Sequence, residues 1–195
     1  MKLLESKTIH NLARSFAGET QASTRYKFIE YGARNEGYNA LAEIIDKIAF
    51  NEFNHGRMFY TYLQKASDKT IDNVEISAGF PYREKWNLVE NLKLAAEDEE
   101  HDRDLYKEFE KTAREEGFEE IANLFNMTAS VEDCHRKLFL DLYEQMKNDT
   151  IYKKPKATKW KCSGCGYEAE SKEAWDKCPL CQAEQGFVML EVANK

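Results

Sequence analysis

The chain is 195 residues long, 42% of them apolar and 32% charged, and its formal net charge at neutral pH is −7. This length accommodates one medium-sized domain with a small one appended, and the negative charge argues against nucleic acid or an anionic membrane as the main partner. No stretch approaches the roughly 18 consecutive apolar residues of a membrane span, and the charged first residues do not resemble a signal peptide, so we expect a cytoplasmic protein.

The first three quarters of the sequence carry apolar residues at the spacing of amphipathic helices. Short turns containing Gly37 and Gly117 separate the helices within each of two pairs, since glycine suits the left-handed residue that ends a helix. A longer connection, 67–83, joins the two pairs. Two helical hairpins joined by one long crossover predict an all-α, ferritin-like four-helix bundle. The predicted helices span about 6–35, 38–66, 84–115 and 118–148.

The two helical pairs are related by an internal repeat of 80 residues. Such repeats usually reflect duplicated packing alone, but here ionisable residues repeat together with the apolar ones. The shift aligns Glu19 with Glu99, Tyr26 with Tyr106, Glu52 with Glu132, and His55 with His135. We therefore expect a polar site that is built in duplicate.

In each predicted helix the apolar stripe is interrupted at mid-length by acidic residues or histidine, so these side chains converge on one level of the bundle interior. Buried carboxylates without partners are too costly to persist, and the stripes offer no inward-facing Lys or Arg at that level. Two metal ions would neutralise the cluster, and oxygen and imidazole ligands suit iron or manganese. A Glu from each of two helices with Glu-x-x-His from each of the other two is a known di-iron arrangement. The candidate ligands are Glu19, Glu52, His55, Glu99, Asp102, Glu132 and His135.

The third helix offers a choice of ligands. Glu97 and Glu100 form a Glu-x-x-Glu pair beside Glu99 and Asp102. The apolar stripe places Glu99 and Asp102 inward and the other two residues on a solvated face, so we prefer the inward pair. Either Asp102 or one of Glu97 and Glu100 could complete the site.

Tyr26 and Tyr106 lie one or two helical turns from the predicted acidic level. Their positions are those of core aromatic residues, and their hydroxyls could also hydrogen-bond to the ligand carboxylates. The candidate catalytic residues are therefore Glu52, His55 and Glu132 together with these two tyrosines.

The helical pattern, 1–148, gives way to a basic stretch, 149–158, which is predicted to be a linker. The remaining residues, 159–195, are too few to bury an adequate core without a metal ion. Two Cys-x-x-Cys motifs in this part can place four thiolates around one iron or zinc ion, and their spacing does not distinguish the two metals. Cys134 stands alone and is expected to be an ordinary buried or semi-buried thiol. The four candidate ligands are Cys162, Cys165, Cys178 and Cys181.

Three segments of the sequence resemble the rubrerythrin family. The run 16–26, Phe-Ala-Gly-Glu-Thr-Gln-Ala-Ser-Thr-Arg-Tyr, resembles the first-helix signature of these proteins, and 113–118 resembles the turn into their fourth helix. The pattern Cys-x-x-Cys-Gly-Tyr followed by Cys-Pro-x-Cys is similar to their rubredoxin domain, which binds a single iron. The resemblance extends over nearly the whole chain.

This resemblance implies a non-haem peroxidase that acts in oxidative-stress protection. A di-iron site would reduce hydrogen peroxide to water, and a rubredoxin-like β domain would deliver electrons from an NAD(P)H-dependent reductase. Head-to-tail homodimers are also implied. Glu52 and Glu132 would bridge the two iron ions, and reduction would move one iron from Asp102 to His55.

Two residues depart from the family pattern. Asp102 stands where the resemblance implies Glu, and Gln182 stands where it implies Gly after the fourth cysteine. A competing interpretation is a ferritin-like iron-oxidising or storage protein with a zinc ribbon as an interaction module. The appended four-cysteine domain favours electron delivery, because storage cages seldom need one.

Overall fold

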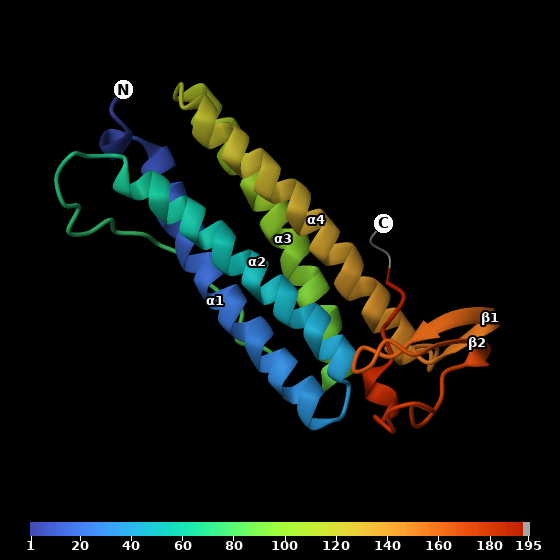
Figure 1. Ribbon diagram of the computed structural model, residues 1–195. Helices are drawn as coiled ribbons and strands as arrows, with labels where there is room; N and C mark the ends of the chain where they lie inside the picture. The colour runs from blue at the N-terminus through green and yellow to red at the C-terminus, as the bar shows by residue number, and fades with distance from the viewer. Residues whose placement is uncertain (193–195) are drawn as a thin grey trace.

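The computed structural model describes residues 1–192 and shows a long helical bundle with a small β domain at one end (Figure 1). A short 3-10 helix, η1 (Leu3–Glu5), precedes the bundle. The four long helices are α1 (Lys7–Asn35), α2 (Asn39–Gln64), α3 (Leu88–Glu115) and α4 (Glu119–Lys147). This architecture confirms the predicted ferritin-like bundle with an appended small domain. Within the described residues, no helix is both long enough and apolar enough to span a membrane.

The helix ends follow from local sequence signals. Gly37 and Gly117 adopt φ values of +88° and +84° and turn the chain between the helices of each pair. Ser6 begins α1 by accepting a hydrogen bond from the backbone N–H of Ile9. Asn87 does the same for α3 at Glu90, so α3 begins at Leu88 rather than at the predicted position 84.

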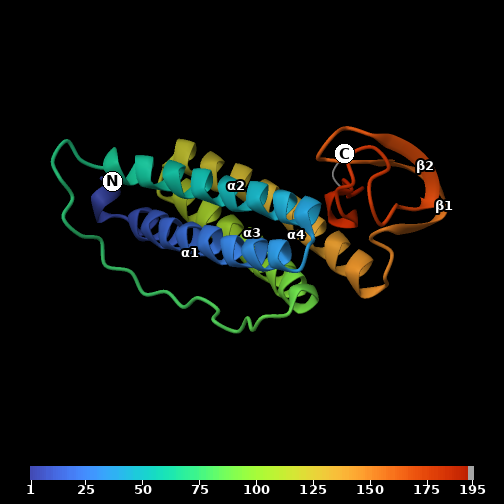
Figure 2. The same cartoon turned by 60° about the horizontal axis from the view of Figure 1, so that its bottom comes forward.

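The connection between α2 and α3, residues 65–87, contains no helix or strand and runs alongside α1 (Figure 2). Its end is held in place by Trp86, whose indole lies over Gly32. A Cβ atom at Gly32 would lie only 1.6 Å from Trp86 Cη2, so this position requires glycine. Trp86 Nε1 also donates to Glu36, at 2.7 Å. The crossover is therefore attached to α1 although it has no regular structure.

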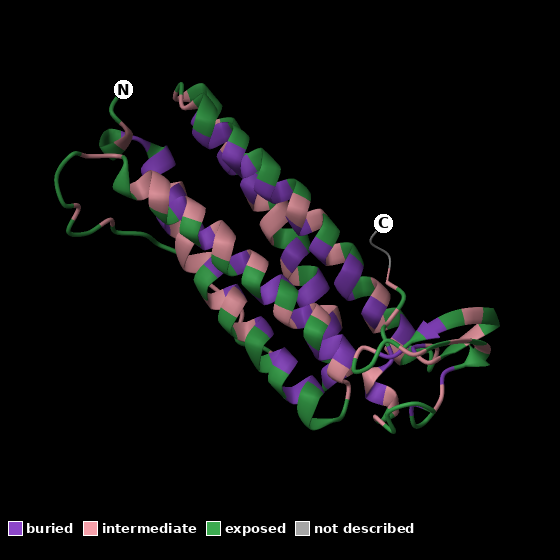
Figure 3. Cartoon of the chain, viewed as in Figure 1, coloured by how far each residue is buried: buried purple, intermediate pink, exposed green. Residues whose placement is uncertain are grey.

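Buried residues recur along all four long helices (Figure 3). One apolar cluster, nearer the β domain, includes Ile45, Leu92 and Phe139. A second cluster at the other end of the bundle includes Phe59 and Phe125. Between these two clusters lies the polar layer that the sequence predicts.

In the C-terminal domain, β1 (Lys153–Lys161) pairs with β2 (Glu168–Glu173) in an antiparallel sheet. A small core forms around the fully buried Trp160, with Ala174 and Val188. A 3-10 helix, η2 (Gln185–Phe187), follows. Residues 153–158, part of the predicted linker, form the first part of β1, and the domain boundaries at 148 and 158 stay a prediction.

The small domain contacts the bundle at the turn between α1 and α2. A Cβ atom at Gly186 would lie 1.6 Å from the carbonyl oxygen of Gly37, so glycine is needed for this close approach. The rings of Tyr38 and Tyr152 stack with their centroids 6.4 Å apart. Gln145 Nε2 on α4 donates to the carbonyl of Glu191 at 2.9 Å. These contacts place the four-cysteine domain at one end of the bundle.

Candidate metal centre

Four glutamates, one from each long helix, meet between the two apolar clusters. They are Glu19, Glu52, Glu99 and Glu132, and all four are at least 97% buried. Each replaces an apolar residue on the inward stripe of its helix, so the helical period alone directs it to the bundle axis. Two histidines one turn later, His55 and His135, join them.

His55 Nδ1 faces three carboxylates at once. It lies 2.9 Å from Glu52 Oε2, 3.1 Å from Glu132 Oε1 and 3.7 Å from Glu19 Oε2. A ring nitrogen has one proton or one lone pair, so it cannot satisfy three carboxylates. Ligand atoms of these four residues all lie within 4.8 Å of one another.

His135 Nδ1 repeats this arrangement on the other side of the polar layer. It lies 2.8 Å from Glu52 Oε1, 3.1 Å from Glu132 Oε2 and 3.8 Å from Glu99 Oε1. Glu52 and Glu132 thus belong to both groups, with one oxygen turned to each histidine. The two imidazole rings are stacked with their centroids 5.9 Å apart.

The donor set fits a pair of metal ions. Glu52 Oε1 and Glu132 Oε1 are buried and accept no hydrogen bond, although each lies near a histidine nitrogen, because the directions are unsuitable. A buried carboxylate oxygen without a partner is costly unless a cation occupies the space before it. Four carboxylates and two imidazoles around two centres match the composition of di-iron carboxylate sites.

Burial and the neighbouring charges shift the pKa values of this cluster far from their usual values. Burial, with the charge of Glu132, raises the pKa of Glu19 well above its usual value. Burial acts to raise the pKa of Glu52 too, but both histidines outweigh it and lower that pKa to about 2. Burial favours neutral His135, yet Glu52 and Glu132 raise its pKa to about 10. The layer therefore retains protons that bound cations would displace.

Two tyrosines support the outer carboxylates in a reciprocal manner. Tyr26 Oη on α1 donates to Glu99 Oε1 on α3 at 2.7 Å, and Tyr106 Oη on α3 donates to Glu19 Oε1 on α1. Both tyrosines are at least 98% buried. The hydrogen bonds that the sequence made possible are thus present, and they orient the two carboxylates that belong to only one histidine group.

The structure leaves Asp102 outside both ligand groups. Asp102 lines a small cavity of about 40 Å³ beside the crossover, together with Tyr106 and Phe80. Burial first, and then the charge of Glu132, raises the pKa of Asp102 to about 7. Glu97 and Glu100 are exposed and pair with Arg83 and Arg103 respectively. Glu99 is therefore the α3 acid at the site, and a ligand role for Asp102 stays a prediction.

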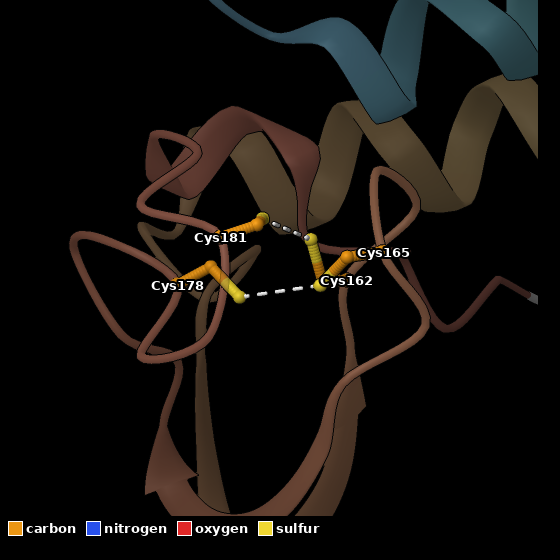
Figure 4. A group of neighbouring side chains, drawn as sticks. All are labelled: Cys162, Cys165, Cys178 and Cys181. Carbon is orange, nitrogen blue, oxygen red and sulfur yellow. Dashed lines mark hydrogen bonds between the residues drawn. The ribbon is translucent and has the colours of Figure 1, made fainter.

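The four cysteines of the small domain form a metal-binding group of their own. Two loops bring their sulfur atoms together, as Figure 4 shows, with Cys162 Sγ 3.8 Å from Cys181 Sγ and Cys165 Sγ 3.6 Å from Cys178 Sγ. A metal ion with tetrahedral bonds of about 2.3 Å to sulfur requires sulfur atoms about 3.8 Å apart. All are free thiols, so the spacing fits a four-thiolate metal site.

The loop geometry of this site tolerates the unusual Gln182. Its φ is +63°, matching the left-handed Gly166 after the second cysteine, whose φ is +77°. Burial acts to raise the pKa of Cys178, but the backbone N–H groups of Cys181 and Leu180 outweigh it and lower that pKa to about 7. Backbone stabilisation of thiolate is thus present despite the missing glycine.

Sequence reasoning missed one contact at the bundle site. Asn51 Nδ2 lies 3.2 Å from His135 Nε2, on the far side of the ring from the carboxylates. The signal was a break in the 80-residue repeat, since Val131 occupies the equivalent position on α4. The prediction that Cys134 is buried or semi-buried is wrong, because its side chain lies on the exposed face of α4. It lies outside the metal-binding groups found in residues 1–192.

Two family models match this chain. One, described as rubrerythrin, matches residues 10–87 and 90–170, and the other, described as the rubredoxin-like domain of rubrerythrin, matches residues 160–187. A rubrerythrin from Clostridium perfringens is 40% identical over 190 residues, with 96% of each chain covered. A rubrerythrin from Nitratidesulfovibrio vulgaris is 35% identical, with 93% of each chain covered.

Solved structures with a similar fold are more distant in sequence. Nigerythrin in a partially reduced state superposes with a TM-score of 0.62 and 24% identity, covering 94% of this chain and 86% of that one. A mycobacterial bacterioferritin gives a TM-score of 0.63 at 19% identity and covers 72% of this chain and 86% of that one. At these identities the likeness establishes the fold, and the bacterioferritin match involves less of the chain.

Proposed function

The chain belongs to the rubrerythrin family, with a di-iron site in the bundle and a rubredoxin-like iron site in the small domain, and from this premise we propose that it is a peroxidase that reduces hydrogen peroxide to water. One observation carries the proposal. Two adjacent ligand groups share Glu52 and Glu132, in the same chain as a four-thiolate site suited to one-electron transfer.

Glu19, Glu52, His55, Glu99, Glu132 and His135 would hold two iron ions, which when bound would supply the two electrons that peroxide reduction needs and Lewis acidity toward the O–O bond. The protein provides their spacing through Glu52 and Glu132, each of which turns one oxygen to either side of the polar layer. Tyr26 and Tyr106 hold the carboxylates of Glu99 and Glu19 in place through their hydroxyl protons. The two apolar clusters close the bundle interior on either side of the polar layer.

A proton for product water can come from Asp102, which lies outside both metal-binding groups of the bundle. Burial, with the charge of Glu132, raises the pKa of Asp102 to about 7. Asp102 lies beside the small cavity that also reaches Tyr106. A carboxyl group with a pKa near neutrality can both hold and release a proton at physiological pH.

Electrons are proposed to enter through the four-cysteine centre from an NAD(P)H-dependent reductase. The sulfur-bearing residues Cys165 and Cys181 are exposed, so a donor can approach this centre closely. The cytoplasm is the proposed location, because reducing conditions keep such thiols available for metal binding. A negative net charge of −7 suits a donor with positively charged patches.

Iron analysis combined with visible spectroscopy tests this function. We expect about three metal ions per chain, and a strong visible absorption from ferric iron at the thiolates. After reduction under anaerobic conditions, one hydrogen peroxide should be consumed for every two electrons returned. A colourless zinc site with many iron ions accumulating per chain would instead support the storage interpretation.

A further inference from the structure

Asn51 lies one residue before Glu52 on α2 and contacts His135 on α4. Its amide lies 3.2 Å from His135 Nε2, whereas His135 Nδ1 faces oxygens of Glu52 and Glu132 at 2.8 and 3.1 Å. Both nitrogens of this ring are therefore fixed, one by carboxylates and the other by the amide. The ring cannot turn without breaking the contact with Asn51.

His55, the counterpart of His135 in the 80-residue repeat, lacks such a contact. The position equivalent to Asn51 is Val131, whose side chain neither donates nor accepts a hydrogen bond. In the part of the chain that the structure describes, no side chain hydrogen-bonds to His55 Nε2. The His55 side chain is also the more exposed, at 16% against 4% for His135.

The amide of Asn51 suits His135 both with and without a metal ion. A histidine that binds a metal through Nδ1 keeps its proton on Nε2 and needs an acceptor there. Asn offers Oδ1 as an acceptor or Nδ2 as a donor, and rotation of the amide exchanges the two. Asn51 can therefore donate to Nε2 when Nδ1 holds the proton, and accept from Nε2 when Nδ1 binds a metal.

We propose that Asn51 is a positioning residue that fixes His135 with Nδ1 toward the metal, and that Val131 leaves His55 without this restraint, so the two metal positions differ in affinity. The group with His135 is the tighter position, and the group with His55 is the weaker one. This inference rests on the di-iron centre of the proposed function but not on any reaction with peroxide.

Substitution at position 51 is structurally feasible. Asn51 is half-buried and borders a cavity of about 460 Å³ between α2, α4 and the C-terminal residues Met189 and Leu190. A side chain of different shape can therefore be accommodated without displacing the apolar clusters. Val131 borders the same cavity, so an asparagine side chain can be accommodated there as well.

The test is anaerobic titration of the full-length protein with ferrous iron after a chelator has emptied the bundle sites. Asn51→Val is expected to weaken the tighter of the two sites by about 10- to 100-fold, the usual effect of removing a partner of a metal-bound histidine. Val131→Asn is expected to tighten the weaker site. The absorption of the four-cysteine centre serves as an internal control and should not change.

Two further variants separate hydrogen bonding from packing. Asn51→Asp keeps an acceptor for Nε2–H and is expected to keep the affinity that Asn51→Val loses. In a His135→Ala background, Asn51→Val is expected to cost no further affinity, because the ring that it holds is absent. No loss in Asn51→Val, or an equal loss in the His135→Ala background, overturns the inference. A protein that binds iron in this way but consumes no peroxide would refute only the proposed function.

Discussion

His55 and His135 occupy equivalent places in the repeat, yet their surroundings make them unequal ligands. His55 is the more exposed and faces Glu19, Glu52 and Glu132, whereas His135 is anchored by Asn51. A ligand without a partner on its outer nitrogen can leave the metal more easily. This difference supports the expectation that His55 binds iron chiefly in the reduced state.

We therefore predict that His55→Ala retains most of its ferric iron but reduces peroxide at least about tenfold more slowly, equivalent to about 1.4 kcal/mol in the barrier. Metal analysis of the oxidised variant, together with turnover measurements, checks this prediction. His135→Ala is the control and should lose iron in both oxidation states. Depleted iron in oxidised His55→Ala would mean that His55 is a permanent ligand.

Gln182 gives a second prediction at the scale of one residue. Its φ of +63° lies in the left-handed region, which costs a residue with a side chain about 1 kcal/mol relative to glycine. Gln182→Gly should therefore raise the free energy of unfolding of the metal-loaded small domain by up to about 1 kcal/mol. The greater entropy of glycine in the unfolded chain offsets part of this gain. Chemical denaturation followed at the thiolate absorption measures it. Gly166→Ala, at φ +77°, should lower stability, and a stabilising effect there would contradict the reasoning.

The first turn of α1, which Ser6 caps locally, is also held by a residue of a distant element. Glu116, in the turn between α3 and α4, accepts hydrogen bonds from the backbone N–H groups of Lys7 and Thr8, each at 2.9 Å, and from Thr8 Oγ1 at 2.6 Å. Burial acts to raise the pKa of Glu116, but these hydrogen bonds outweigh it and lower the pKa below its ordinary value. The cap thus ties the two hairpins together at one end of the bundle.

A lowered pKa means that the folded protein favours the carboxylate, so its contribution is complete above pH 4.5 and is lost as pH falls through the folded pKa. Glu116→Gln should cost about 1 kcal/mol of stability at neutral pH, the usual value of a helix cap. Denaturation curves between pH 3 and pH 7 should show this difference shrink in acid. Glu115→Gln, an exposed neighbour, is the matched control; a difference independent of pH would argue against the carboxylate.

At the scale of elements, the sequence predicted what depends on periodic patterns. The helices and their inward acids follow from apolar spacing. The 80-residue repeat indicated the same inward position independently for Glu19 and Glu99. Strand β1 was not predicted, because it carries lysines on both faces and only Trp160 is buried. Asn51 was also missed, since the identity of its partner depends on how α2 and α4 pack, which no pattern within one helix encodes.

At the scale of the whole molecule, the di-iron site of the bundle and the four-cysteine site of the small domain lie far apart within one chain. The small domain contacts the bundle at Gly37, and Glu52 lies fifteen residues further, which is about 22 Å at the rise of a helix. Electron transfer weakens steeply with distance, so this placement favours delivery to a partner chain. A head-to-tail dimer would bring the four-cysteine centre of one chain beside the di-iron site of the other.

Mixed dimers test this arrangement. One chain carries Cys162→Ser and lacks the four-thiolate iron, and the other carries Glu52→Ala and lacks the paired site. Each homodimer should be inactive, whereas the mixed dimer should regain up to about half of the activity of the unmodified dimer, because one of its two pairs of sites is competent. Sedimentation of the purified mixture establishes its assembly state. Lack of complementation in a verified mixed dimer would show that electrons do not pass between chains.

The crossover of residues 65–87 separates two helical hairpins that each hold half of the ligands. The exposed part of this segment around Asn73 and Glu75 has no regular structure to lose when it is cut. A protease nick there would leave two fragments, each with one Glu-x-x-His motif and one further glutamate, and neither with a complete centre. Association of the two fragments should then depend on ferrous iron. Reassembly could be titrated with the metal and reversed with a chelator.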